Sequence, residues 1–367
     1  MKNRLKIFVG VSGGVDSSVS AALLRDEGHD VTGVFIRTWT PEWIPCTWRQ
    51  ERRDAMRVCA HLGIPFLECD AVDSYKQGVV DYMIDEYRKG RTPNPDVMCN
   101  RVVKFGIFWN FAVSHGADAI ATGHYAQNIS SIQKDGDTEI YHHSLVRGVD
   151  TEKDQSYFLW TLTQNDLEHT LFPIGHLFKK KVRLLAKKYC LPTATKKDSQ
   201  GVCFLGLIDM KEFLQHYIDT QPGNILNIDG KKIGIHPGAV YFTIGERHGF
   251  NTKKQTVNDK PLYVVAKDMK ANTITVAEKT KNDNTTEYTD YTMVSITPVS
   301  WVLEPAQKNS MCTAQILYHG QQYAVTVSEA TAHEAKIILH ARPSIAPGQS
   351  VVFYDGMRVI GGGVVEK

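Results

Sequence analysis

The sequence predicts an α/β domain with a parallel sheet, followed by two smaller β-rich domains. Up to about residue 190, short apolar runs alternate with segments of helical apolar spacing. From residue 223 onward, short β-type runs separated by glycines replace this alternation. The 367 residues also exceed one typical core, since a domain averages about 150 residues. We therefore predict domains at 1–205, 206–280 and 281–367.

The first domain begins with an apolar run, LKIFVGV, and a segment in which Val19, Leu23 and Leu24 share one helical face. The same strand-then-helix pattern continues along the domain. Strands alternating with helices imply a parallel sheet covered on both faces. We predict strands at 5–11, 31–36, 65–69 and 118–122, and helices at 17–27, 51–62, 75–89 and 102–114.

The second half of the chain contains glycine-punctuated β-type runs, including GKKIGIHPGAVYFTIG and CTAQILYHGQQYAVTV. These runs favour antiparallel sheets. A polar segment at 280–292, TKNDNTTEYTDYT, is the best linker candidate between two β-rich domains. Near the end, Asp355 and Gly356 form an Asp-Gly pair between β-type runs, which predicts a hairpin turn.

Composition narrows the class of protein. With 42% hydrophobic and 22% charged residues and a net charge of +2, the chain resembles an ordinary globular protein, and only local basic clusters could indicate RNA binding. Its seven cysteines lack CxxC or Cys/His zinc spacing, so we expect no metal centre and no disulfide framework. No apolar run approaches 18 residues and the first strand starts near residue 5, which favours a cytoplasmic protein without membrane contact.

The first turn of the chain, SGGVDSS at 12–18, has the composition of an anion site. It matches neither of the two commonest phosphate loops, GxxxxGK[ST] and GxGxxG. Its glycines nevertheless let backbone amides approach a phosphate, and the helix predicted after it would point its free N–H groups at the same place. The alternative is a structural turn in which Ser17 or Ser18 caps the helix.

The SGGxDS pattern between the first strand and the first helix resembles the loop of the PP-loop, or N-type, ATP pyrophosphatases. The resemblance implies a fold like the adenine nucleotide alpha hydrolases. It also implies that ATP, with Mg²⁺, is cleaved between its α- and β-phosphates to activate a carbonyl oxygen. The nucleotide-binding residues implied in this way are Gly10, Val11, Ser12, Gly13, Gly14, Val15, Asp16, Ser17, Ile36 and Gly123.

Two later segments carry cysteines in unusual surroundings. In GRTPNPDVMCN (90–100), the prolines enforce an extended path and predict a helix that begins after Cys99. A thiolate at that helix N-terminus would be stabilised. The second segment, KDSQGVCF (197–204), is a polar turn that contains Cys203. Either cysteine alone is more often a small buried hydrophobic residue than a nucleophile.

Six motifs in order, SGGVDSS, GRTPNPDVMCN, ATGHYA, EKDQSYFL, KDSQGVCF and IGERHG, resemble the tRNA-specific 2-thiouridylases of the MnmA family over essentially the whole chain. The resemblance implies that the wobble uridine of tRNAs for Lys, Glu and Gln receives sulfur at its 2-position. It also implies a β-barrel as the last domain. A sulfur-relay protein or a cysteine desulfurase would supply the sulfur.

In this family pattern, Cys203 carries sulfur as a persulfide and Cys99 is the second thiol. Either the persulfide attacks the activated carbon directly, or Cys99 releases hydrosulfide in the pocket; both routes end with a Cys99–Cys203 disulfide. Asp96 matches a position proposed for acid/base help. Its alternative role is an Asx-type turn residue in a proline-rich loop.

The resemblance also implies residues that contact tRNA, and these are Asn94, Pro95, Asp96, His124, Lys153, Asp154, Gln155, Tyr318 and Gln349. His124 follows a predicted strand, where α/β folds place their ligands, but it could equally be a structural hydrogen-bond donor. The segment 179–197 carries eight Lys or Arg and no acidic residue, which indicates either an RNA-binding patch or the solvated face of a helix.

The chain departs from the family pattern at Ile36, where Met is usual, at Gln200, where Thr is usual, and at Leu317, where Arg is usual. Two other functions remain open. One is a PP-loop enzyme that activates a carbonyl for nitrogen, such as a tRNA lysidine synthetase, which would have no use for Cys99 and Cys203. The other is a non-catalytic RNA-binding protein, which would not need an intact loop.

Overall fold

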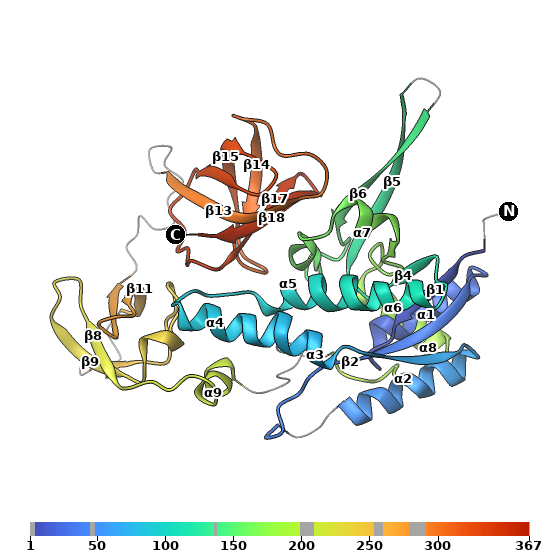
Figure 1. Ribbon diagram of the computed structural model, residues 1–367, viewed down its shortest axis with the longest axis horizontal. Coiled ribbons are helices and arrows are strands. Elements are labelled where there is room, and N and C mark those ends of the chain that lie inside the picture. Colours follow the sequence, from blue (N-terminus) through green and yellow to red (C-terminus); the bar gives the residue numbers. More distant parts are fainter. Residues whose placement is uncertain are drawn as a thin grey trace.

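The computed structural model describes residues 4–44, 48–135, 138–198, 209–252, 260–278 and 291–366, with backbone only at 134–135, 138–140 and 251. Figure 1 shows an α/β part in blue and green, a smaller β part in yellow and a barrel in orange and red. Residues 199–208 and 279–290 fall outside the described ranges, so both predicted domain boundaries and most of the predicted linker remain predictions.

The first domain contains the predicted parallel sheet. Its strand order is β3-β2-β1-β4-β7, and every neighbouring pair is parallel. The fifth strand was not predicted, because two residues are too few for a sequence pattern. The strands are β1 (Lys6–Gly10), β2 (Asp30–Arg37), β3 (Phe66–Asp70), β4 (Ala119–Ala121) and β7 (Thr170–Leu171).

Successive side chains of β1 point to opposite faces of the sheet, and they are apolar on both faces. Helices therefore cover both faces of the sheet. Ile7 and Val9 pack in one core cluster with helices α1, α2 and α8, whereas Phe8 packs in another cluster with Phe108. The helices of the first face are α1 (Val15–Asp26), α2 (Trp48–Leu62) and α8 (Lys179–Lys188).

Two long helices with π-type middle turns lie beside the other face. Gly78 allows them to approach, because a Cβ at this position would lie 2.8 Å from Val102 Cγ1. The first comprises α3 (Val72–Tyr75), η1 (Lys76–Asp81) and α4 (Tyr82–Arg88); the second comprises α5 (Pro95–Cys99), η2 (Asn100–Ile107) and α6 (Phe108–Ser114).

The prediction that a helix begins after Cys99 is wrong. The helix begins at Pro95, because the Asn94 side chain accepts a hydrogen bond from Val97 N at 3.3 Å and proline suits the first helical position. Cys99 is therefore the fifth residue of the helix rather than its N-terminus, and its side chain is buried. The helix-dipole argument for its thiolate weakens accordingly, since that effect fades within the first turn.

A long antiparallel hairpin, β5 (Ala126–Asp135) and β6 (Thr138–Arg147), extends from the α/β domain (Figure 1). It was not predicted. Val146 of β6 pairs with Arg358 of the last strand, which joins the hairpin to the barrel sheet. The short elements that follow the hairpin are η3 (Ser156–Leu159) and α7 (Gln164–Glu168).

The middle part is a five-stranded sheet in the order β10-β9-β8-β12-β11. It is antiparallel as predicted except for β8 and β12, which pair in parallel. Its elements are α9 (Met210–Gln215), β8 (Gly223–Leu226), β9 (Lys232–His236), η4 (Ala239–Tyr241), β10 (Asn251–Thr252), β11 (Leu262–Asp268) and β12 (Thr273–Glu278).

The last part is a closed six-stranded barrel, because β13 pairs with both β16 and β18. The expected hairpin is present, with Asp355 paired to Arg358 and Gly356 at φ +59° in the turn. No helix within the described residues is long and apolar enough to cross a membrane. The strands are β13 (Thr292–Trp301), β14 (Met311–Gln315), β15 (Gln322–Ala330), β16 (Ala335–Leu339), β17 (Ser350–Asp355) and β18 (Arg358–Val365).

Candidate active site

The SGGVDSS loop connects β1 directly to α1, which begins at Val15, two residues earlier than predicted. Gly13 has φ +73°, and a Cβ there would lie 2.5 Å from the Glu51 carbonyl oxygen, so the tight loop path requires glycine. The first-turn N–H groups of α1 have no carbonyl acceptor within the helix and face this loop. The loop therefore has the backbone donors of an anion site.

Neither Ser17 nor Ser18 is the N-cap, which is Gly14 without a side-chain cap. Ser17 Oγ instead accepts a hydrogen bond from Ser12 N at 3.2 Å, across the loop. Ser18 Oγ donates to Gly14 O at 2.6 Å. The serines thus fix the shape of the loop, and the capped-turn alternative is wrong in its detail.

Gly123 lies two residues after the end of β4, the strand that pairs with β1, and packs against the first turn of α1. A Cβ on Gly123 would lie 2.7 Å from Ser17 N, closer than real Cβ contacts come. Gly10, by contrast, is the last residue of β1 and has ordinary space around it, with Ile36 of β2 among its neighbours. The predicted nucleotide-binding residues therefore gather at the carboxyl edge of the sheet, where open α/β sheets bind ligands.

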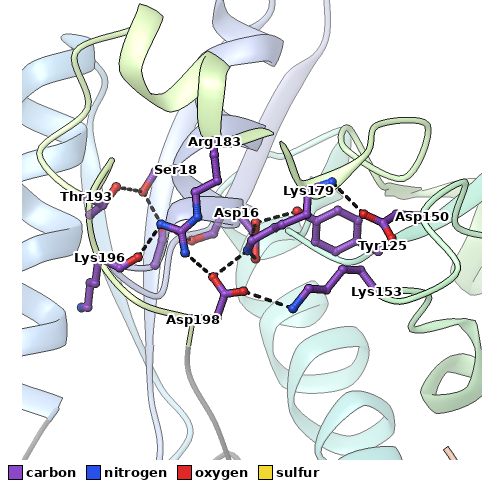
Figure 2. A network of polar contacts seen from close by, with 12 residues as sticks. Asp16, Ser18, Tyr125, Asp150, Lys153, Lys179, Arg183, Thr193, Lys196 and Asp198 are labelled. Carbon is purple, nitrogen blue, oxygen red and sulfur yellow. Dashed lines mark hydrogen bonds and ion pairs between the residues drawn. The ribbon is translucent and has the colours of Figure 1, made fainter. Parts of the chain in front are cut away.

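A network of charged side chains borders the loop (Figure 2). Lys179 Nζ lies 2.8 Å from both carboxylate oxygens of Asp16 and 2.9 Å from Asp198 Oδ1. Lys153 Nζ lies 3.2 Å from Asp198 Oδ2, and Arg183 also pairs with Asp198. Burial acts to raise the pKa of Asp198, but the bonds and charges of Lys179 and Lys153 outweigh it and lower the pKa. Asp198 is therefore held ionised five residues before Cys203.

Two further side chains, Tyr125 and Lys196, make polar contacts around the loop. Tyr125 OH donates to Asp16 Oδ1 at 2.8 Å, and burial together with the Asp16 charge raises the pKa of this phenol. Lys196 Nζ lies 3.0 Å from Gly13 O and 2.9 Å from Asp54 Oδ2. The loop is thus bounded by ammonium groups on two sides.

The basic segment 179–197 divides into inward-facing and exposed side chains. Its inward side chains Lys179, Arg183 and Lys196 pair with the acidic groups of the network, so they are no solvated face. The remaining basic residues of the segment, which are Lys180, Lys181, Lys187, Lys188 and Lys197, are exposed.

His124 is buried among hydrogen-bond partners rather than displayed on the surface. Thr122 Oγ1 lies 2.7 Å from its Nδ1, and Lys104 Nζ lies 3.4 Å from its Nε2. Burial, then the charge of Lys104, lowers the pKa of His124 well below its ordinary value. The ring is therefore neutral near pH 7, which favours the structural alternative for it.

A second group of predicted residues lies at the start of α5. Asn94 and Asp96 are half-buried, while Pro95 and Cys99 are buried. Tyr318 of the barrel lies nearby: burial raises its pKa, followed by the charges of Asp154 and Asp96.

Tyr318 packs on the α/β domain, with its ring centroid 4.5 Å from that of Phe158. It is 37% exposed, so part of the ring remains available to a stacking partner. Gln349, also in the barrel, is buried, and its Oε1 accepts a hydrogen bond from Ala346 N at 2.8 Å. This amide is thus engaged in shaping its own turn.

The three predicted tRNA contacts at 153–155 differ in how far their side chains are already engaged by the protein. Asp154 is 6% exposed and accepts hydrogen bonds from Arg147 Nη1 at 2.8 Å, Gly148 N at 2.9 Å and Ser156 Oγ at 3.0 Å. Gln155 Oε1 accepts from Tyr125 N at 3.0 Å. Only Lys153 extends a partly exposed charged group.

The predicted residues therefore form two neighbouring groups, one around the loop and β4 and one around α5 and the barrel. Ile36 links them, because it packs against the core cluster that contains Cys99. Cys203 and Gln200 lie outside the described residues, so the Cys99–Cys203 pairing stays a prediction.

Sequence reasoning missed Lys179, Tyr125 and Asp198 as parts of the site. Tyr125 and Asp198 stood inside motifs that carried the resemblance, so the sequence did signal them. The inward direction of Lys179 depends on how α8 packs on α1. Among the described residues no group of three or more His, Cys, Asp or Glu could hold a metal ion.

Three family models match the chain in order. They are the tRNA methyl transferase HUP domain at residues 5–207, the tRNA methyl transferase PRC-barrel domain at 211–278 and the aminomethyltransferase β-barrel domain at 292–365. The three matches follow the α/β, mixed β and barrel parts of the structure.

Similar proteins cover the whole chain. "tRNA-specific 2-thiouridylase MnmA 2" of Geobacillus kaustophilus is 42% identical over 366 residues, which is 99% of this chain and 95% of that protein. "tRNA-specific 2-thiouridylase MnmA" of Bacillus subtilis is 41% identical, over 98% of this chain and 95% of that protein. Among solved structures, the U34-tRNA thiolase NcsA of Methanococcus maripaludis is 18% identical with a TM-score of 0.35, over 59% of this chain and 63% of that one. By its full-length relatives, this chain belongs to the tRNA-specific 2-thiouridylase family.

Proposed function

We propose that this protein is a tRNA 2-thiouridylase that replaces the 2-oxygen of the wobble uridine, position 34, in tRNAs for Lys, Glu and Gln. The observation that carries the proposal is the SGGVDSS loop at the N-terminus of α1. The helix that contains Asp96 and Cys99 belongs to the same α/β domain. Full-length relatives named 2-thiouridylases support it.

The residues at the loop fit ATP as a substrate. The first turn of α1 offers backbone N–H donors, and Gly13 and Gly123 leave room where side chains would intrude. Lys179 and Lys196 supply positive charge beside the loop, and Asp16 is the carboxylate within it. ATP would bring Mg²⁺ with it, and Asp16 is the residue we expect to face that ion.

ATP supplies an adenylyl group to the 2-carbonyl oxygen, which converts a poor leaving group into a phosphate ester, with release of pyrophosphate. The terminal sulfur of a Cys203 persulfide then attacks carbon 2. The Cys99 thiolate attacks Sγ of Cys203 and breaks the sulfur–sulfur bond. Sulfur stays on the base, AMP departs, and a Cys99–Cys203 disulfide remains that an external thiol must reduce.

We expect Asp96 to exchange a proton with the base, and its position on the same helix as Cys99 and near Tyr318 supports this role. The half-exposed ring of Tyr318 suits stacking on a base that has left the anticodon loop. We expect Lys153 and the exposed lysines of 179–197 to contact RNA phosphates. We also propose the domain limits 1–205, 206–280 and 281–367, a cytoplasmic location, and a relay protein or desulfurase as sulfur donor.

The test is thiolation of unmodified tRNA. Protein, tRNA, Mg-ATP and a persulfide donor are incubated, and the RNA is separated on a gel that contains an organomercurial, which retards thiolated tRNA. A retarded band that depends on ATP supports the proposal, and tRNA for Lys with C34 in place of U34 should give none. Absence of any retarded band with active, folded protein would contradict it.

The alternative, activation of a carbonyl for amination, predicts a different result in the same reaction. An ammonium source would then give ATP cleavage to AMP and pyrophosphate without a persulfide donor, and substitution of Cys99 would have no effect. Parallel reactions with ammonium chloride and with the persulfide donor separate the two functions.

A further inference from the structure

Residues 90–92, which precede Pro93 and the Asn94 helix cap, contact all three parts of the molecule. Gly90 lies against the middle part, since a Cβ there would be 2.6 Å from Met269 Cγ. Thr92 Oγ1 lies 3.2 Å from Thr243 Oγ1 of the same part. Thr92 N donates to Pro347 O of the barrel at 2.7 Å. This tripeptide therefore forms a junction between the parts.

Arg91 makes the strongest contacts of the junction. Its Nε lies 2.6 Å from Glu86 Oε2 at the end of α4. Its Nη1 and Nη2 donate to the carbonyl oxygens of Glu366 and Val365, at 2.9 and 3.1 Å. The planar fork thus joins α4 to the end of β18, and a lysine could not reproduce this geometry.

Val365, one of the two residues whose carbonyl oxygens bind Arg91, also binds the turn that contains Gln349. Val365 O accepts a second hydrogen bond from Gly348 N at 2.9 Å, and Val365 N donates to Gln349 O at 2.8 Å. A Cβ on Gly348 would lie 2.7 Å from Thr92 N, so the turn and the junction are in direct contact. The Arg91 side chain thus binds the same backbone segment of β18 that holds this barrel turn in place.

On its other side, Arg91 precedes Asn94 by three residues and Asp96 by five. We propose that Arg91 is a positioning residue that keeps the loop bearing Asn94 and Asp96 in register with the barrel turn of Gln349, so that one tRNA meets both surfaces at once. The proposal rests on the tRNA-modifying function proposed above. Arg91 acts through the protein in this proposal, since three N–H groups of its guanidinium bind Glu86, Glu366 and Val365.

The experiment compares Arg91→Met, Arg91→Lys and Lys89→Met. Lys89 is the matched control because its Nζ lies 3.0 Å from the same Glu86 carboxylate and its side chain is 64% exposed. We expect Arg91→Met to raise KM and the dissociation constant for tRNA about tenfold, with kcat and KM for ATP within about twofold of wild type. Arg91→Lys should lie between, and Lys89→Met should match wild type.

The dissociation constant is measured by gel shift with unmodified tRNA and needs no catalysis. Failure of the proposed function would appear as wild-type protein that yields no thiolated tRNA. Failure of the Arg91 proposal would appear as equal tRNA affinities for Arg91→Met and Lys89→Met. Loss of ATP affinity in step with tRNA affinity would also overturn it, because that pattern indicates general unfolding. If Arg91→Met does not fold, the same comparisons are decided with Arg91→Lys.

Discussion

Lys179 and Asp16 lie 163 residues apart in sequence and meet in an ion pair at the SGGVDSS loop, with Lys179 Nζ 2.8 Å from both carboxylate oxygens. The Lys179 side chain is 13% exposed and that of Asp16 is 30% exposed, so the pair is partly shielded from solvent. Its ammonium also reaches Asp198, which connects the loop to the segment that leads to Cys203. Lys179 thus connects the candidate nucleotide-binding loop with the chain segment that precedes Cys203.

Replacement of Lys179 by Met should raise KM for ATP about tenfold or more, because a charged hydrogen-bond donor contributes about 1.5–3 kcal/mol and 1.4 kcal/mol equals a factor of ten. Lys89→Met is the control, since Lys89 is an exposed lysine that belongs to neither group of site residues. Initial rates of AMP release at varied ATP measure both. Equal KM values for the two variants would contradict a role of Lys179 in nucleotide binding.

Gly123→Ala should weaken ATP binding without weakening tRNA binding. The added methyl group would lie 2.7 Å from Ser17 N and 2.9 Å from Asp16 C, so the first turn of α1 must shift. Displacement of the loop donors should raise KM for ATP about tenfold. A gel shift with tRNA serves as the internal control. Wild-type KM for ATP in the variant would show that Gly123 does not shape the nucleotide site.

Cys99→Ser and Cys203→Ser should each abolish the retarded band on the mercury gel, because one thiol would carry sulfur and the other would release it. ATP-dependent adenylation, followed with labelled ATP, should persist in both variants. Cys190→Ser is the control, since Cys190 is exposed. Thiolation that survives both substitutions would refute the assigned roles while leaving the activity itself intact.

Asp154→Ala should lower the free energy of unfolding by about 3 kcal/mol, because it removes the carboxylate partner of Arg147, whose side chain is only 14% exposed. Lys153→Ala should cost less than about 1 kcal/mol, as expected for a partly exposed ion pair. Urea unfolding measures both. The opposite order, or weaker tRNA binding by Asp154→Ala at unchanged stability, would favour direct contact of Asp154 with RNA.

Lys267 predicts a pH dependence of stability. Burial lowers its pKa from 10.5 to about 8, against the opposing charge of Glu246. The unfolded chain therefore holds this proton more tightly, and stability rises with pH between about 8 and 10. Relative to Lys267→Met, wild type should gain about 1 kcal/mol or more between pH 7 and pH 10 in urea unfolding. A difference independent of pH would contradict the shift.

The parallel sheet was predictable because each strand and helix is encoded in consecutive residues. The run from Leu5 to Val11 and the apolar spacing after it are local patterns, and the parallel order of β1, β2 and β3 follows from their alternation with helices. The start of the Cys99 helix was misplaced, since the cap formed by Asn94 could not be distinguished from a turn. The β5–β6 hairpin was missed, because its mixed polar strands lack clear alternation.

The loop, the order of the domains and the two cysteine segments could be recognised in the sequence, because these features depend on neighbouring residues. The inward direction of Lys179 toward Asp16, and the link that Arg91 makes between α4 and the carbonyls of β18, arise from the packing of distant segments. The burial of Asp154 and His124 among protein partners has the same origin. Charged side chains are placed by whichever opposite charge folding brings near, and that partner lay 163 residues away for Lys179.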